Sequence, residues 1–292
     1  MSTPTTKPQR RSRPPAWATD VHVYEPHVTG IPPVREYLRE VWRRREFALE
    51  LSRTQLRTQQ YGTVLGQIWL VLNPVLLALV YFVLVDIIRA GEREPAVFAH
   101  LLAGIFGYHY MSTSIREGAI SLTRSGRLIL NSSFPRMLLP LSACVSSLKM
   151  FLPTVPLYLI AHAAFGLPVA VDTLWVLVLL AMMTMLGTGL ALLAAAVQVY
   201  FRDLKSFLPY VLRGMLFGSP VLYFATRIPE SYSWLLDVNP VGQVMAAWEQ
   251  AIYFANTPTT HSLLVAGAWS VGSLVVGTLF FMSREREFAV RL

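Results

Sequence analysis

The sequence predicts an all-α, polytopic membrane protein with six transmembrane helices and both termini on the cytoplasmic side. Hydrophobic residues make up 54% of the 292 residues and charged residues only 14%, against roughly 25% in soluble domains. Between the clusters of charge lie apolar stretches long enough to cross a bilayer, which takes about 20 helical residues. Twenty of the 25 Lys and Arg residues fall on one side of these stretches and three on the other. The excess of positive charge marks the cytoplasmic side.

The first 60 residues precede the apolar stretches and divide into two parts. Residues 1–32 are rich in Pro, Arg, Ser and Thr and lack the apolar core of a signal peptide, so we expect a disordered cytoplasmic tail. Residues 33–60 predict an amphipathic helix with Val34, Leu38 and Trp42 on the apolar side and arginines opposite. This pattern is typical of a helix lying in the membrane interface. A soluble helix packed on a partner is the alternative.

The transmembrane domain is predicted to cover residues 61–292. The second predicted span is the least apolar, because it contains His100, His109 and Arg116, and Pro153 and Pro156 interrupt the third. The six spans are expected at about 63–88, 95–121, 137–165, 172–199, 207–224 and 262–282.

Residues 225–260, between the last two spans, are too polar for a span but rich in Trp, Tyr and apolar residues. They predict two short helices, about Ile228–Leu236 and Val241–Phe254, separated by Asn239-Pro240. A pair of helices that enters the membrane from outside without crossing it fits this pattern, because surrounding protein can satisfy its backbone.

Motifs of enzymatic chemistry are missing from the sequence. It has no Gly-Lys pair and therefore no phosphate-binding loop, and it has no nucleophile elbow. Its single cysteine excludes an intrachain disulfide. We therefore predict no catalytic residue and no metal site. A membrane-bound glycosyltransferase would need acidic residues that we do not find, and a secondary carrier would need ionisable groups at mid-membrane. The net charge of +8 follows from the topology and does not indicate nucleic-acid binding.

Two cations and several aromatic residues inside the spans are candidates for substrate contact. Lys149 and Arg213 are costly in a bilayer and predict contact with a phosphate group of a substrate. Snorkelling to a lipid headgroup or pairing within a dimer is the alternative. Aromatic rings deep in a pore offer weak, stackable contacts for a polymer, although rings near span ends also form interfacial belts. The candidate pore residues are Trp69, Tyr81, Tyr108, Tyr210, Phe217 and Tyr223.

Four short motifs occur in order along the chain: 57–74, which contains Asn73-Pro74, then 134–140, 199–204 and 239–241. With the predicted topology, they resemble the membrane subunits of ABC-2-type polysaccharide exporters, which serve O-antigen, teichoic acid and related glycans. Within this family, the sequence is most similar to the permeases that export the lipid-linked galactan precursor of mycobacterial cell walls.

The resemblance implies a homodimer in the cell (inner or plasma) membrane, paired with two copies of a separate ABC ATPase that binds ATP and Mg. The substrate would be a polyprenyl-diphosphate-linked polysaccharide moved from the cytoplasm to the outer face. The helix at 33–60 would be an interface helix, and 225–260 would hold gate helices. A coupling helix would lie between Ser121 and Ser133, with a plain topogenic loop as the alternative. Its ATPase contacts would be Arg124, Ser125, Gly126, Arg127, Leu128 and Ile129.

Arg53, Arg57 and Tyr61 lie where the interface helix meets the first span. Arginine pairs bidentately with phosphate. We therefore hypothesise that a polyprenyl diphosphate from the inner leaflet docks at these three residues.

Overall fold

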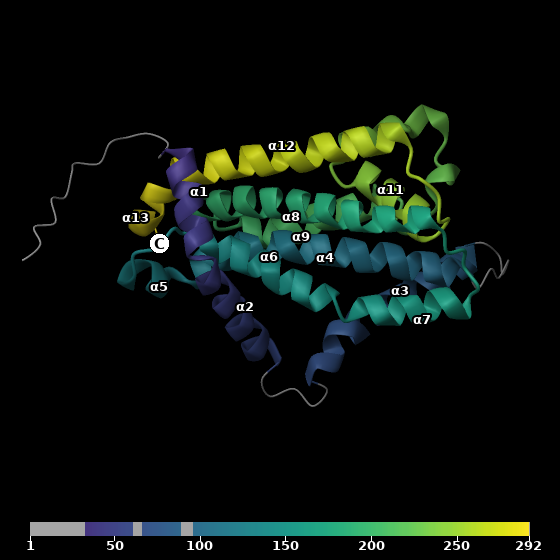
Figure 1. The fold of residues 1–292 in the computed structure, drawn as a ribbon, viewed down its shortest axis with the longest axis horizontal. Helices are drawn as coiled ribbons and strands as arrows, with labels where there is room; N and C mark the ends of the chain where they lie inside the picture. Colours follow the sequence, from purple (N-terminus) through teal and green to yellow (C-terminus); the bar gives the residue numbers. More distant parts are fainter. Residues whose placement is uncertain (1–32, 61–65, 89–95, 292) are drawn as a thin grey trace, which may run out of the picture. The chain divides into compact units, whose positions relative to one another are not determined.

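The computed structural model describes residues 33–60, 66–88 and 96–291, and the regular structure in these ranges is helical (Figure 1). The predicted tail, 1–32, lies outside the described residues, as does Tyr61.

The predicted amphipathic helix is present as two helices, α1 (Val34–Arg43) and α2 (Arg45–Gln60). The break falls at Arg44, whose guanidinium donates to the carbonyl of Ser133 at 2.8 Å. Val41 is buried, whereas Trp42 is exposed and carries the guanidinium of Arg45 4.6 Å from its ring centroid. The helix therefore packs on the bundle by a narrow stripe and leaves an aromatic–cationic surface outside it.

Within the described ranges, four helical segments are long and apolar enough to cross a membrane. They correspond to the first, third, fourth and sixth predicted spans. The third contains two helices that meet at Leu152-Pro153, as the prolines predict. The helices are α3 (Trp69–Ile88) after the short turn η1 (Gly66–Ile68), α6 (Leu138–Phe151) with α7 (Thr154–Ala164), α8 (Trp175–Tyr200) after η2 (Val171–Leu174), and α12 (Thr260–Arg284).

The second and fifth predicted spans do not meet the same criterion, for different reasons. Helix α4 (Ala96–Arg124) has 29 residues, which is ample length. It is the central helix, packed on α3, α6, α8, α9 and α11, and a helix enclosed by protein tolerates polar residues that lipid would not. Helix α9 (Leu204–Phe217) has only 14 residues, or about 21 Å, and stops at Gly218, short of the predicted end at 224. The number of six spans therefore stays a prediction.

Small residues bring α8 close to α12. An added Cβ on Gly277 would lie 2.1 Å from the carbonyl oxygen of Gly189, and one on Gly189 would lie 2.3 Å from the backbone of Ser273. Close backbone approach through small residues is typical of helix packing in membranes, where burial of apolar surface gives little driving force.

The segment before α12 holds two helices on either side of Asn239-Pro240, as predicted: α10 (Trp234–Val238) and α11 (Gly242–Ile252). Two further turns, η3 (Ala225–Arg227) and η4 (Glu230–Tyr232), come first, so the first helix is shorter than predicted. Helix α11 is almost wholly buried among α4, α8 and α12. Its 11 residues are too few to cross a bilayer.

A second, smaller core lies at the other end of the bundle, around the loop that follows α4. Helix α5 (Gly126–Asn131) occupies this loop, and α13 (Phe288–Arg291) follows the turn η5 (Glu285–Glu287) at the C-terminal end. Phe288 and Ile129 are both buried in this core. Phe288 packs edge-on against Phe281, with ring centroids 5.1 Å apart.

Candidate functional site

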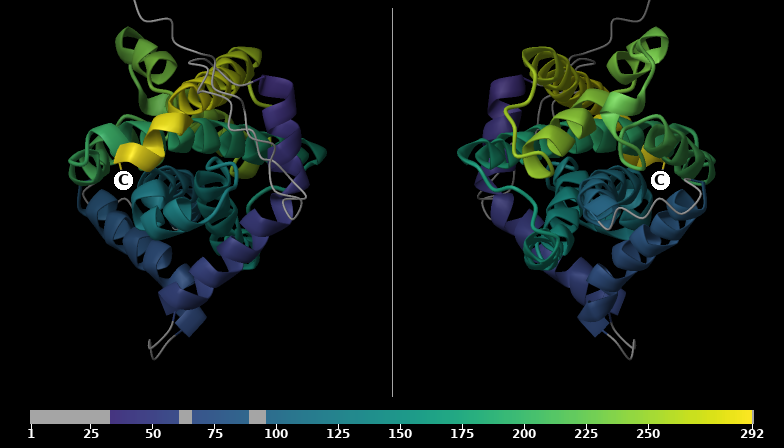
Figure 2. Two further views of the ribbon diagram at one scale, coloured as in Figure 1. Left: turned by 90° about the vertical axis from the view of Figure 1, so that its left-hand side faces the viewer. Right: turned by 90° about the vertical axis from the view of Figure 1, so that its right-hand side faces the viewer.

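A cavity of about 530 Å³ lies among α3, α4 and the α6–α7 pair. Each helix lines it with residues spaced three or four apart, which share one helical face. Figure 2 shows α3 and α2 on opposite sides of the α4 and α6 pair.

The α3 wall begins at Gly66, whose φ of +49° lies in the left-handed region that favours glycine. The chain then turns through η1 into α3 and presents Trp69 and Asn73 to the cavity. Trp69, a predicted pore residue, is 39% exposed and lines this cavity.

The α4 wall supplies the charged groups. His109, Thr113 and Arg116 follow one another along the face of α4 that lines the cavity, and Glu117 lies beside them. Glu117 pairs with Arg124 at 3.0 Å and with Arg116 at 3.7 Å. The closer partner of this carboxylate is therefore the arginine outside the cavity.

The α6–α7 wall adds Ser147, Met150, Phe151 and Thr154. Ser147 and Thr154 donate their hydroxyl protons to carbonyls of the preceding turn, at 3.0 Å and 2.7 Å. This wall thus has a hydroxyl group at each end and two apolar side chains between them.

Lys149, predicted to contact phosphate, lies instead between α6 and α2. Its amine donates to the hydroxyl of Ser52 at 2.6 Å. One turn earlier, Ser146 donates to the side-chain oxygen of Gln55 at 3.1 Å. Lys149 therefore fastens α2 to the bundle, and its contact with phosphate stays a prediction.

The three residues of the predicted diphosphate site are only partly described. Arg53 is exposed on α2 and pairs with Glu50 one turn before it. Arg57 lies within α2, but its side chain falls outside the described residues, as does Tyr61. Their convergence on a diphosphate stays a prediction.

Five of the six predicted pore aromatics gather around α9. The rings of Tyr81 and Phe217 meet edge-to-face with centroids 6.5 Å apart. Tyr223 donates to the carbonyl of Phe217 at 3.1 Å. Tyr108 is buried and donates to the carbonyl of Leu212, so it joins α4 to α9 and does not face open space. Tyr210 remains 69% exposed.

Helix α9 has two distinct faces. Leu208, Leu212 and Leu216 are buried against the bundle. Tyr210 and Arg213 lie on the opposite, exposed face. Arg213, the predicted intramembrane arginine, therefore has Tyr210 one turn away, and within the described residues no other segment covers its side chain.

A short helix, α5, occupies the loop in which a coupling helix was predicted, and its coupling role stays a prediction. Ile129, named as an ATPase contact, points into the core beneath the helix. Arg124 and Arg127 are exposed, and Leu130, which sequence reasoning missed, is 62% exposed. The run of apolar residues at 128–130 contained the signal, because a short helix cannot bury three successive side chains.

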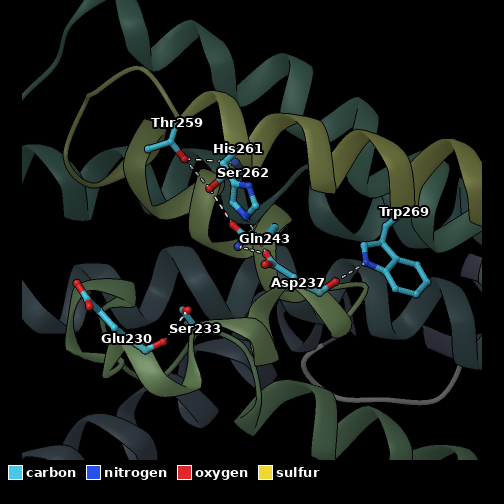
Figure 3. Close-up of polar contacts among 8 residues, drawn as sticks. All are labelled: Glu230, Ser233, Asp237, Gln243, Thr259, His261, Ser262 and Trp269. Carbon is cyan, nitrogen blue, oxygen red and sulfur yellow. Dashed lines mark hydrogen bonds and ion pairs between the residues drawn. The ribbon is translucent and has the colours of Figure 1, made fainter.

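A polar network that sequence reasoning missed joins α10, α11 and α12 (Figure 3). The carboxylate of Asp237 accepts from the amide of Gln243 at 2.7 Å and lies 3.0 Å from Nε2 of His261. Ser262 donates to Gln243 at 2.8 Å, and the indole of Trp269 donates to the carbonyl of Asp237 at 2.8 Å. These residues are spread along the chain from Asp237 to Trp269 and belong to no recognisable motif.

Helix α11 also carries a buried carboxylate, Glu249, that accepts from the backbone of Ala225 at 3.1 Å. Burial raises the pKa of Glu249 to about 8. Among the residues that the structure describes, no group of His, Cys, Asp and Glu side chains has the arrangement of a metal site.

Comparison with family models finds no match for this chain. Its curated relatives include an "O-antigen export system permease protein RfbA" of Myxococcus xanthus, 30% identical over 255 residues, which cover 86% of this chain and 97% of the relative. A protein of the same name from Klebsiella pneumoniae is 24% identical over 82% of this chain and 92% of its own length. The chain therefore belongs to the family of polysaccharide-export permeases typified by the O-antigen export system, whose members are not themselves the catalytic subunits.

Proposed function

We propose that this chain is the membrane subunit of an ATP-driven exporter of a polyprenyl-diphosphate-linked cell-envelope polysaccharide, with galactan as the polymer. The observation that carries this proposal is the similarity to an export permease along 97% of that relative. The direction of transport is from the cytoplasm to the outer face of the inner membrane.

A separate ABC ATPase, present in two copies and binding ATP and Mg, docks on α5 in this proposal. The geometry of α5 supports it. Ile129 anchors the helix from below, while Arg124, Arg127 and Leu130 are exposed. A short helix held by a core on one side transmits a push from a partner to the helices that it joins, here α4 and α6.

A second copy of the chain completes the membrane domain in this proposal. Arg213 is exposed on a predicted span, where contact with lipid alone is costly. A homodimer that brings two α9 helices to a common path removes this cost and surrounds the path with Tyr210 and Phe217. Aromatic walls with few strong hydrogen bonds suit a polymer that must keep moving.

Affinity purification of the chain from its native host, followed by mass spectrometry and ATPase assays, tests the proposal. We expect an ABC ATPase at a one-to-one ratio and ATP turnover that lipid-linked galactan stimulates. A lipid-linked glycan of different composition serves as the control for the polymer. A chain that purifies without an ATPase in mild detergent, or whose depletion leaves lipid-linked glycan export intact, would contradict the proposal.

A further inference from the structure

We propose that the cavity among α3, α4 and α6–α7 binds the head of the lipid-linked precursor, namely a diphosphate that carries its first sugar. This inference rests on the proposed function and adds a place within one protomer where the substrate is recognised. It involves residues other than the exposed face of α9.

The size and position of the cavity suit such a head. Its volume of about 530 Å³ falls within the range of roughly 300–1,000 Å³ that is typical of ligand sites. The stripe on α4 that lines it extends from Phe106 to Glu117, or about 16 Å along the helix axis. Arg116 lies two turns before α4 ends and α5 begins. The charged end of the cavity is therefore the end nearest the predicted cytoplasmic surface.

The charge at this end suits a diphosphate. Within the described part of the chain, Glu117 is the one ion-pair partner of Arg116, at 3.7 Å. Glu117 lies closer to Arg124, at 3.0 Å. Arg116 is also half-exposed. Its planar guanidinium therefore keeps donors for an anion, and arginine binds phosphate oxygens in pairs. Two arginines about one glutamate leave an excess of positive charge.

The remainder of the cavity suits a sugar. The amide of Asn73, the imidazole of His109 and the hydroxyl of Thr113 come from two helices and lie in the same cavity. The partly exposed indole of Trp69 lines the α3 side. A few polar groups placed in a largely apolar wall fix the orientation of a small ligand. An aromatic ring offers an apolar face to a sugar ring while the hydroxyls reach the polar groups.

A phospholipid headgroup shares the phosphate chemistry but has no sugar ring to contact Trp69 and the polar groups of the cavity. The test therefore measures binding of three probes to the full-length chain with its co-purified partners in phosphatidylcholine nanodiscs. The probes are a short-chain polyprenyl diphosphate bearing one sugar, the same diphosphate without the sugar, and phosphatidylglycerol. The variants are Arg116→Gln, Trp69→Ala and the control Arg227→Gln, which alters an exposed arginine of η3 outside the cavity.

We expect the sugar-bearing probe to bind most tightly to the wild type. Arg116→Gln should weaken binding of both diphosphates by roughly tenfold or more. Trp69→Ala should abolish the preference for the sugar-bearing probe while leaving affinity for the bare diphosphate within about twofold. Arg227→Gln should match the wild type. Circular dichroism of each variant checks that the helices remain folded.

Equal affinity of wild type and Arg116→Gln for both diphosphates would overturn the inference, as would phosphatidylglycerol binding as tightly as the sugar-bearing probe. Export measured in cells separates this failure from failure of the proposed function. If Arg116→Gln exports normally and the depleted strain does not, the function stands and the site is wrong. If the depleted strain exports normally, the function itself is wrong.

Discussion

The phenol of Tyr37 in α1 donates a hydrogen bond to the carboxylate of Glu285, 248 residues later in the chain. The same carboxylate accepts from the backbone amide of Arg136 at 2.6 Å, and the guanidinium of Arg136 donates to the carbonyl of Glu285. Burial raises the pKa of Tyr37, so the phenol remains a neutral donor at physiological pH. Glu285 therefore joins α1, the segment that leads into α6, and the C-terminal turns.

Replacing Glu285 with Ala should lower the free energy of unfolding by about 2 kcal/mol, because hydrogen bonds to a charged acceptor are lost and the partly buried donors of Tyr37 and Arg136 are left without this partner. Unfolding in mixed micelles, followed by circular dichroism, measures the change. Glu287→Ala is the matched control, since Glu287 is on the surface and pairs with Arg284 and Arg291. A loss of stability for Glu287→Ala as large as for Glu285→Ala would contradict the role of the hydrogen bonds around Glu285.

Phe288 holds α5 from beneath, because its fully buried ring shares a core with Ile129. Phe288→Ala should cost about 3 kcal/mol of stability and, under the proposed function, reduce polymer exported per ATP hydrolysed. Phe288→Leu should restore most of both. Val290→Ala, at a 90% exposed position two residues later, should change neither. Export and ATPase activity measured on the same preparation give the ratio, and an unchanged ratio in Phe288→Ala would refute the link.

The contact between α8 and α12 predicts a position-specific response to added methyl groups. Gly277→Ala should be strongly destabilising, because its Cβ meets the backbone of Gly189 at 2.1 Å and backbone cannot move aside cheaply. Gly272→Ala on the same helix has open space around its Cβ and should be neutral or slightly stabilising. Thermal unfolding of the two purified variants decides the matter. Equal transition temperatures would show that the helices are farther apart than in the structure.

Glu249 predicts a pH dependence of stability. Its pKa rises from the usual 4.5 to about 8 on burial, so the folded state favours the protonated carboxyl. The contribution of protonated Glu249 to the free energy of unfolding is fully present below pH 4.5 and is lost as the pH rises through about 8. The wild type should therefore be less stable at pH 9 than at pH 5.

Glu249→Gln should be less sensitive to pH over the same window, because it has no carboxylate to ionise. Unfolding curves at pH 5, 7 and 9 test this expectation. The exposed Glu230 provides the control, and Glu230→Gln should follow the wild type. Parallel pH profiles for wild type and Glu249→Gln would exclude the carboxyl as the source.

Length and hydropathy were enough to predict the helices that face away from the protein interior. The spans at α3, α8 and α12 agree closely with prediction, because their apolar surfaces are evident in the sequence. Helix α4 contains polar and charged residues because protein surrounds it. A hydropathy criterion identifies helices that face lipid and therefore does not select this one. Helix α9 ends early at Gly218, where Asn239 donates to the Gly218 carbonyl at 3.1 Å. The sequence around Gly218 contains no pattern that predicts this contact with Asn239.

The candidate site was harder to predict than the fold. Trp69 was chosen for its ring, and it does line the cavity. The sequence identified Arg116 only as a polar residue in a weakly apolar span. Its availability to bind an anion depends on the closer pairing of Glu117 with Arg124. Lys149 was chosen because it is a cation in a span, but its partner Ser52 lies on a separate helix. Such pairings depend on how helices pack, which periodicity does not reveal.

The close backbone approach of Gly189 to Gly277 provides a reference for measuring conformational change in this protein. We expect two helices in such close contact to move together, so a pair of spin labels at the exposed residues Val178 and Val271 provides an internal reference distance. Displacement of any other labelled helix is then read against that reference distance, free of the tumbling of the whole particle. A change in the Val178–Val271 distance between nucleotide states would show that the two helices do not move together.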